Sequence, residues 1–192
     1  MKETTIIYAH PNKESFNHAI LTKIEDALQD QDQPYTVLDL YHDQFNSVHS
    51  KEELQYFSEG KAVDPLVISY QQQLKKTSHL ILIFPIWWYD LPAILKGFFD
   101  KVMLNQFSHI NTPAGVKGLL TTIEKVTIIT TFKSPTWYLK YFGGNVIKKG
   151  LIQSTLKTIG IRKSKWVNLD QIDKSSTQKR TKFLERLSRL VA

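Results

Sequence analysis

Cysteine is absent from this sequence of 192 residues, and its absence excludes several kinds of chemistry. Without a thiol there is no disulfide, no thiolate nucleophile and no zinc or iron–sulfur site with cysteine ligands. No apolar run is long enough to span a bilayer, and the run after residues 1–5 is too short for a signal peptide. The motifs G-x-x-x-x-G-K-[ST] and G-x-G-x-x-G are also missing, which disfavours nucleoside-triphosphate and Rossmann-type sites. We therefore expect a soluble, cytoplasmic protein with no integral membrane segment and no metal site.

The composition is that of a globular chain. Hydrophobic residues make up 42% and charged residues 22%, which is enough for a core and argues against disorder. We expect one domain over residues 1–192. The formal charge is +7, with much of the excess late in the chain. This charge fits a nucleic-acid or membrane footprint, or a solvated basic surface that attracts small anions. Because no nucleic-acid-binding motif accompanies it, we favour the second interpretation and predict no nucleic-acid partner.

Short apolar runs alternate with amphipathic segments along the chain. Strands are predicted at 4–9, 36–40, 79–84, 126–131 and 161–169, and helices lie between and after them. Ser15 is a suitable N-cap for the first helix, and Asp90 is expected to cap another with Pro92 in its first turn. A helical stretch over 135–159 is expected to be interrupted at Gly143-Gly144 and at Gly150. This alternation predicts an α/β fold with a five-stranded parallel sheet and helices on both faces.

Ligands of such sheets bind beyond the carboxyl ends of the strands, where the strand order reverses. The first segment to inspect is therefore 10–17, which follows the first strand. A helix begins there, so its free N–H groups and dipole suit a phosphate. Ser15 and Asn17 add donors, and His10 and Lys13 add charge. An ordinary capping loop is the alternative.

Two further segments follow the third and fourth strands. Residues 87–89 are three consecutive aromatics, which cannot all enter the core and could form a wall for a flat ring such as isoalloxazine. A core or interface cluster is the alternative. In the segment 130–138, hydroxyls could bond the polar edge of the ring. There Lys133 could stabilise an anionic reduced flavin and Tyr138 could donate to a quinone oxygen, unless the segment is a plain helix start.

These segments together resemble the NAD(P)H:quinone oxidoreductases of the DT-diaphorase type, the flavodoxin-2 family, and its bacterial branch in particular. The resemblance rests on the His10-Pro11 turn, on residues 15–17, and on the run 84–89 leading into 91–102. It extends to about residue 140 and implies a flavodoxin-like fold. It also implies hydride transfer from NAD(P)H through a flavin, FMN or FAD, to a quinone or similar acceptor in a ping-pong cycle. Family members are homodimers, so the helix from Leu91 and the loop around Phe107 are expected at the interface.

Carried over residue by residue, the resemblance implies two groups of cofactor-binding residues. The flavin phosphate would be held by His10, Ser15, Phe16 and Asn17. The ring would be bordered by Pro85, Ile86, Trp87, Trp88, Tyr89, Thr130, Thr131 and Phe132. Tyr138 and Lys133 are the candidate catalytic residues.

The chain departs from the family pattern at two places. Well-known members follow the two threonines with two glycines, where this chain has Phe132 and Lys133, and a histidine expected downstream is replaced near Gly143-Gly144. A regulatory flavin-binding subunit that docks on a membrane transporter stays open as an alternative, because some relatives of this family serve as such subunits and the basic surface could serve docking. A one-electron flavodoxin carrier is disfavoured, because the chain lacks a phosphate loop rich in Ser, Thr and Gly and lacks an acidic surface.

Overall fold

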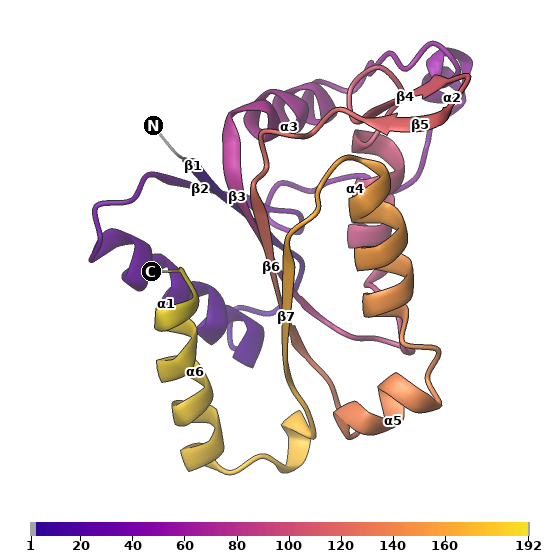
Figure 1. The fold of residues 1–192 in the computed structure, drawn as a ribbon. Coiled ribbons are helices and arrows are strands. Elements are labelled where there is room, and N and C mark those ends of the chain that lie inside the picture. The colour runs from indigo at the N-terminus through magenta and orange to yellow at the C-terminus, as the bar shows by residue number, and fades with distance from the viewer. Residues whose placement is uncertain (1–2, 192) are drawn as a thin grey trace.

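Five parallel strands form the central sheet of the computed structural model, which describes residues 3–191 (Figure 1). Across the sheet the order is β2 (Tyr35–Asp39), β1 (Glu3–Tyr8), β3 (Thr77–Pro85), β6 (Lys125–Thr131) and β7 (Ser164–Leu169). The central strands β1, β3 and β6 are almost continuously buried because helices cover both of their faces. The predicted flavodoxin-like sheet is confirmed.

Two layers of helices enclose this sheet (Figure 1). One layer consists of α1 (Phe16–Gln29) and α6 (Thr177–Val191), which pack on Ile81, Ile83 and their neighbours. The other layer packs on Leu80, Leu82 and their neighbours, and consists of α3 (Pro65–Lys76), α4 (Ala93–Val102) and the π-helix η1 (Ile147–Leu156). Alternate residues of each strand thus supply the two cores. Within the described residues, no helix is both long and apolar enough to cross a membrane.

Several short elements decorate the connections. They are α2 (Lys51–Tyr56), α5 (Thr136–Tyr141), η2 (Ile172–Lys174) and an antiparallel hairpin of β4 (His109–Thr112) and β5 (Gly115–Gly118). The sequence pattern did not predict the hairpin. It docks on the turn before β7, where a Cβ on Gly118 would lie 2.1 Å from Gly160 N. Only glycine permits this contact.

Two predicted helix boundaries are wrong. The helix expected to start at Asp90 begins at Ala93, with Pro92 as its N-cap. Asp90 instead closes a tight turn by exchanging backbone hydrogen bonds with Trp87. Gly150 lies inside η1 and does not interrupt it, whereas residues 143 and 144 do separate α5 from η1.

The chain reverses direction across the sheet between β1 and β3. β2 lies on one side of β1, and all later strands of this sheet lie on the other side. The loops after β1 and β3 therefore leave toward opposite faces of the sheet, which opens a crevice at the strands' carboxyl ends. This crevice is where the sequence places its candidate ligand segments.

Candidate functional site

A cavity of about 590 Å³ opens at the carboxyl ends of the strands, beside the point where their order reverses. Its size is in the range of small-molecule sites. Four loops, which follow β1, β3, β6 and β7, supply its walls. The lining residues are His10, Ser15, Phe16, Asn17, Pro85, Ile86, Trp87, Trp88, Tyr89, Thr131, Phe132, Lys133, Ser134, Ile172 and Asp173.

The start of α1 supplies polar groups to one end of the cavity. Ser15 is the N-cap, as predicted, and its Oγ accepts from His18 N–H at 3.2 Å. The N–H groups of Phe16 and Asn17 have no carbonyl one turn earlier in the helix. Asn17 is 3% exposed, and its Nδ2 donates to Thr131 Oγ1 at 2.9 Å, while its Oδ1 is buried without a hydrogen-bond partner. A buried polar atom left unpaired is costly, so this amide is positioned for a ligand.

His10 stands beside this helix start. Its Nδ1 lies 3.1 Å from Asn12 N and 3.2 Å from Asn12 O, and its ring centroid lies 6.0 Å from that of Trp87. Burial lowers the pKa of His10 below its ordinary value of 6.5, although the hydrogen bond with Asn12 opposes the shift. The neutral form of the ring therefore predominates at pH 7. Lys13, in the same loop, is exposed and is not among the lining residues.

The aromatic wall is built on a two-residue turn. Trp87 and Asp90 exchange N–H···O bonds of 3.1 and 2.9 Å, which leaves Trp88 and Tyr89 at the tip with φ values of 49° and 67°. Bulky side chains rarely adopt this left-handed conformation, and such strain is concentrated at functional sites. Trp88 is 94% exposed and Trp87 41% exposed. The expectation that the three aromatics do not all enter the core is confirmed.

A family model describes this fold and covers nearly the whole chain. Residues 2–191 match the flavodoxin-2 family, whose description is a flavodoxin-like fold. The chain belongs to this family.

Similar proteins carry oxidoreductase names. An uncharacterized NAD(P)H oxidoreductase of Haemophilus influenzae is 32% identical over 158 residues, covering 81% of this chain and 77% of that protein. NAD(P)H dehydrogenase [quinone] 1 of Cavia porcellus is 29% identical over 181 residues, 84% of this chain and 66% of that protein. This chain therefore spans about two thirds of the length of the Cavia porcellus relative.

Two solved structures extend the similarity over whole chains. Smu.1420 from Streptococcus mutans UA159 has a TM-score of 0.85 at 31% identity, covering 98% of each chain. The NAD(P)H:quinone oxidoreductase from Methanothermobacter marburgensis has a TM-score of 0.86 at 25% identity, covering 99% of this chain and 95% of that one. The flavodoxin-2 architecture is thus shared from end to end.

The two threonines at the end of β6 serve different faces of the flavodoxin-2 sheet. Thr131 lines the cavity, whereas Thr130 is not among the lining residues. Successive strand residues point to opposite faces. The Thr130 hydroxyl donates to Asn168 Oδ1 at 2.8 Å and accepts from Trp166 Nε1 at 2.9 Å, on the far side of the strand. Phe132 is 6% exposed and packs edge-on against Tyr89, with ring centroids 5.7 Å apart.

Ser134, Ile172 and Asp173 also line the cavity. Ser134 belongs to the segment 130–138 whose hydroxyls were expected near the ring, whereas Ile172 and Asp173 were not predicted. Ile172 and Asp173 follow β7, so inspecting the end of the fifth strand as well would have found them. Asp173 pairs with the exposed Lys133 at 3.1 Å, which ties the loop after β6 to the loop after β7.

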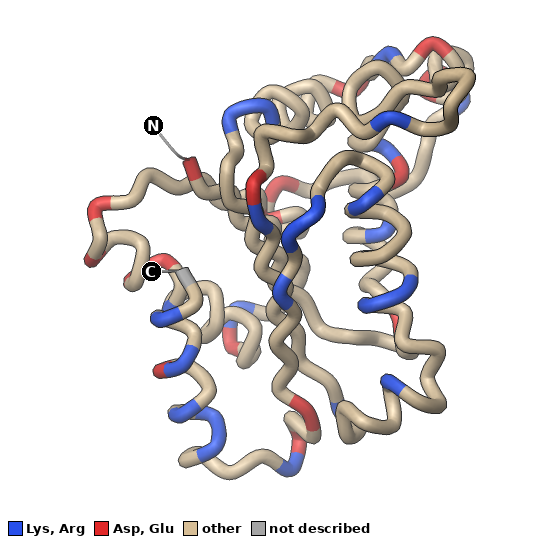
Figure 2. The backbone as a smooth tube through the Cα atoms, viewed as in Figure 1, with Lys and Arg blue, Asp and Glu red and all other residues tan. Residues whose placement is uncertain are grey.

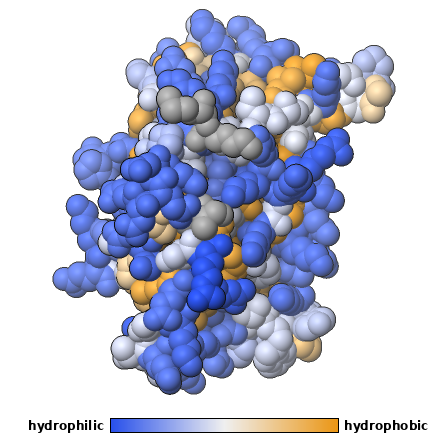
Figure 3. All heavy atoms as spheres, turned by 60° about the vertical axis from the view of Figure 1, so that its left-hand side comes forward, coloured by the Kyte–Doolittle hydropathy of each residue, from blue (hydrophilic) through white to orange (hydrophobic). Residues whose placement is uncertain are grey.

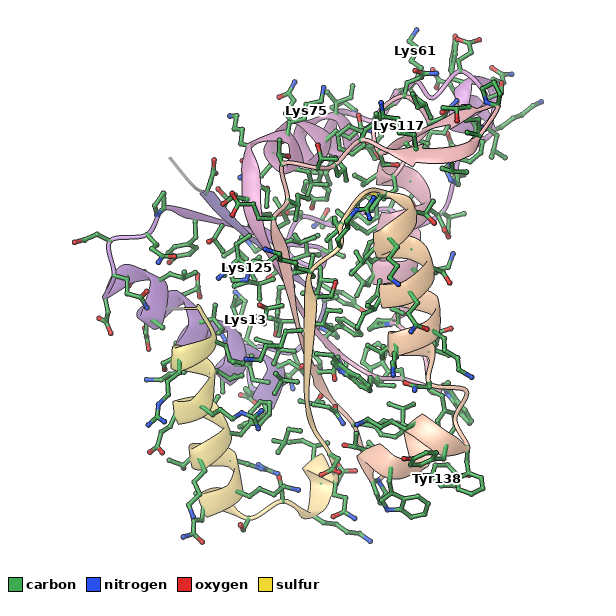
Figure 4. The ribbon with its side chains drawn as sticks, in the orientation of Figure 1. Lys13, Lys61, Lys75, Lys117, Lys125 and Tyr138 are labelled. Atoms are coloured by element: carbon green, nitrogen blue, oxygen red, sulfur yellow. The ribbon has the colours of Figure 1, made fainter. Side chains whose placement is uncertain are left out.

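Tyr138 lies outside the cavity lining, on α5 (Figure 4). Its ring centroid is 6.1 Å from that of Tyr89, a lining residue, so Tyr138 packs against the cavity wall without lining the cavity itself. Its ring also stacks on Phe142, with centroids 5.6 Å apart.

Asp170, just after β7, positions α5. Its Oδ2 accepts from the N–H and the hydroxyl of Thr136 at 2.9 Å each, and its Oδ1 accepts from Lys179 at 2.9 Å. Burial alone would raise the pKa of Asp170, but these hydrogen bonds outweigh it and hold the pKa below its usual range. The carboxylate stays ionised and caps the helix that carries Tyr138. Within residues 3–191, no three His, Asp or Glu side chains gather as a metal site would require.

Proposed function

We propose that this protein is a flavin-dependent NAD(P)H oxidoreductase that reduces a quinone or a similar small acceptor in a ping-pong cycle. The proposal treats residues 1–192 as one flavin-binding domain. The observation that carries it is the cavity at the strand-order reversal, where an unpaired buried amide oxygen, a helix start and an aromatic wall meet. The names of the relatives from Haemophilus influenzae and Cavia porcellus point to the same chemistry.

The residues present fit a flavin. The free N–H groups at the start of α1 suit the phosphate, and the neutral form of His10 offers a further N–H. The unpaired Asn17 Oδ1 is an acceptor, so it suits a hydroxyl or an N–H of the flavin. Trp87 and Tyr89 supply aromatic surface for the ring, with the Thr131 hydroxyl nearby. FMN and FAD share these parts, so the proposal covers both.

A bound flavin would supply the hydride-transfer chemistry that links NAD(P)H to the acceptor. The chain positions and shields these partners. Phe132 and Tyr89 exclude water from one wall, because both rings are packed together. Lys133, held at 3.1 Å from Asp173, places a cation at the cavity where negative charge develops.

Tyr138 is proposed to donate a hydrogen bond to the acceptor oxygen. It stands behind Tyr89 and is 38% exposed, so an acceptor entering beside that ring would reach its hydroxyl. The test is Tyr138→Phe. If the acceptor half-reaction and the nicotinamide half-reaction both keep their rates, this role is wrong.

A homodimer is also part of the proposal. Exposed apolar side chains on α2 and at its two ends, Val48, Leu54 and Phe57, support a second copy on that side. Gly97 of α4 packs on this loop, since a Cβ there would lie 2.3 Å from a Ser47 backbone oxygen. The side chain of Phe107, expected at the interface, is 9% exposed and lies in the chain's own core. Sedimentation should give a dimer for the native chain and a monomer for the Leu54→Glu/Phe57→Glu variant.

The deciding experiment is an anaerobic stopped-flow mix of flavin-reconstituted protein with NADPH or NADH, followed by menadione. Fast loss and fast recovery of the oxidised flavin absorbance would support the proposal and identify the donor. Flavin binding without bleaching by either nucleotide would overturn it and favour the regulatory transporter subunit. Failure to bind flavin would mean that the aromatic wall serves another purpose.

A further inference from the structure

The net positive charge of this protein comes from the last part of the chain. From Lys140 onward the sequence carries 13 of its 25 lysines and arginines but only 3 of its 18 aspartates and glutamates. The preceding residues are slightly acidic. A separation this strong within one fold produces a surface with a one-sided field.

The structure gathers these cations at one edge of the sheet. The elements after residue 140 are η1, β7 and α6, and β7 is the outermost strand, with η1 on one face and α6 on the other. Figure 2 shows Lys and Arg on all three elements. We call this surface the basic edge and define it by the exposed cations of η1, of residues 162–165 and of α6. They are Lys148, Lys149, Arg162, Lys163, Lys165, Lys179, Lys182, Arg186 and Arg189.

On α6 the cations form a continuous stripe. Lys179, Lys182, Arg186 and Arg189 are spaced three or four residues apart, so they lie on one side of the helix. Figure 3, which brings the left-hand side of Figure 1 forward, shows a largely hydrophilic surface. Arg186 also borders a groove of about 210 Å³ along β7, and Lys140 borders the same groove with Trp166. The basic edge therefore continues across β7 to α5.

Acidic neighbours neutralise little of this charge. Among the described residues of the basic edge, the one ion pair joins Lys179 to Asp170. The other exposed cations are available to an anionic partner. From residue 140 onward, lysines outnumber arginines by nine to four. Lysine attracts a charged surface as a point charge, whereas arginine is preferred for specific nucleic-acid contacts.

Aromatic side chains stand next to the basic edge. Trp137, Tyr141 and Phe142 on and after α5 are 57%, 79% and 72% exposed, on the same short helix as Lys140. Aromatic residues flanked by lysines are typical of proteins at a lipid–water interface. The preceding residues, 131–134, line the cavity, so this aromatic group lies close to the cavity wall.

We infer that the basic edge and the α5 aromatics dock this protein on an anionic lipid surface. The lysines and arginines approach the headgroups, and the aromatic rings insert at headgroup level. On the basis of the proposed function, this arrangement would supply a membrane-dissolved quinone as the acceptor.

The test is flotation of the flavin-reconstituted protein with vesicles, measured without any turnover. Vesicles of phosphatidylcholine with phosphatidylserine should bind the protein at least about tenfold better than phosphatidylcholine alone, and added salt should weaken the binding. Lys182→Glu/Arg186→Glu should abolish this preference. The matched control is Lys61→Glu/Lys117→Glu, at the opposite end of the molecule from α5, and should leave it unchanged (Figure 4).

Each outcome decides the inference. Equal binding to vesicles with and without phosphatidylserine would overturn it. So would an equal loss of vesicle binding in Lys182→Glu/Arg186→Glu and in the control Lys61→Glu/Lys117→Glu. Binding to duplex DNA at least as tight as to the anionic vesicles would also overturn it, in favour of a nucleic-acid partner. A second charge variant, Lys148→Glu/Lys149→Glu, repeats the test on another element. The proposed oxidoreductase function is tested separately from lipid docking, because menadione reduction is measured in solution without vesicles. Lys182→Glu/Arg186→Glu should retain that reduction.

Discussion

A buried histidine should make the stability of this protein depend on pH. His79 lies near the start of β3, 4% exposed, with its Nε2 2.9 Å from Thr127 Oγ1. Burial, reinforced by the positive charge of Lys125, lowers the pKa of His79 from 6.5 to about 4. Lys125 is its cross-strand neighbour on β6, which accounts for the second contribution.

The sign and size follow from proton linkage. Between pH 6.5 and 4 the unfolded chain binds a proton that the folded chain refuses, so stability falls as the pH drops through this window. Above pH 6.5 the cost vanishes. With one pKa unit equivalent to 1.36 kcal/mol, lowering the pH from 7 to 5 should cost about 2 kcal/mol from this residue alone.

The assay is urea unfolding of native protein and His79→Gln at pH 7 and pH 5, followed by tryptophan fluorescence. Native protein should lose about 2 kcal/mol more between the two pH values than the variant loses. His42→Gln, at an exposed histidine, controls for removal of an imidazole as such. His79 lies toward the amino end of its strand, away from the cavity, so bound flavin affects both proteins alike. Equal losses in native protein and His79→Gln would refute the reasoning.

Three further changes test other parts of the structure by urea or thermal unfolding. Lys101→Met should lower the free energy of unfolding by about 3 kcal/mol or more, because Lys101 is 2% exposed and its loss leaves the carboxylates of Glu53 and Asp64 without their cation. A loss below about 1 kcal/mol would contradict this. Trp88→Gly should leave the free energy of unfolding unchanged or raise it by up to about 1 kcal/mol, because glycine adopts the φ of 49° without strain. The same variant should bind flavin more weakly in a titration. A lower free energy of unfolding would show that the turn is unstrained. Gly97→Ala should cost about 1–3 kcal/mol through its clash with Ser47, whereas Gly150→Ala, inside η1, should cost nothing; similar melting temperatures for both would refute the clash.

The sequence predicted the sheet and the general place of the cavity. The five strands were visible because buried parallel strands require unbroken apolar runs, as in 79–84. The loops that line the cavity followed from the rule that ligands bind at the strands' carboxyl ends. Ser15 was recognisable because an N-cap needs a hydroxyl at one local position. These features depend on neighbours in the chain.

Other features depend on contacts between distant residues. Asp90 has the character of an N-cap, but its backbone pairs with Trp87 and the helix begins at Ala93. The hairpin of β4 and β5 forms where the chain meets Gly160, about 40 residues later, and such a contact leaves no local pattern.

The sequence by itself determined the α/β architecture, the aromatic turn at 87–89 and the excess of cations after residue 140. The tertiary structure decided what these elements face. It sends the Thr131 hydroxyl to Asn17 and the Thr130 hydroxyl to Trp166, and it sets η1 and α6 on either side of β7 so that their cations form one surface. The physical reason is that composition and periodicity are local, whereas the partner of a side chain is set by which strands pair and which helices cover them.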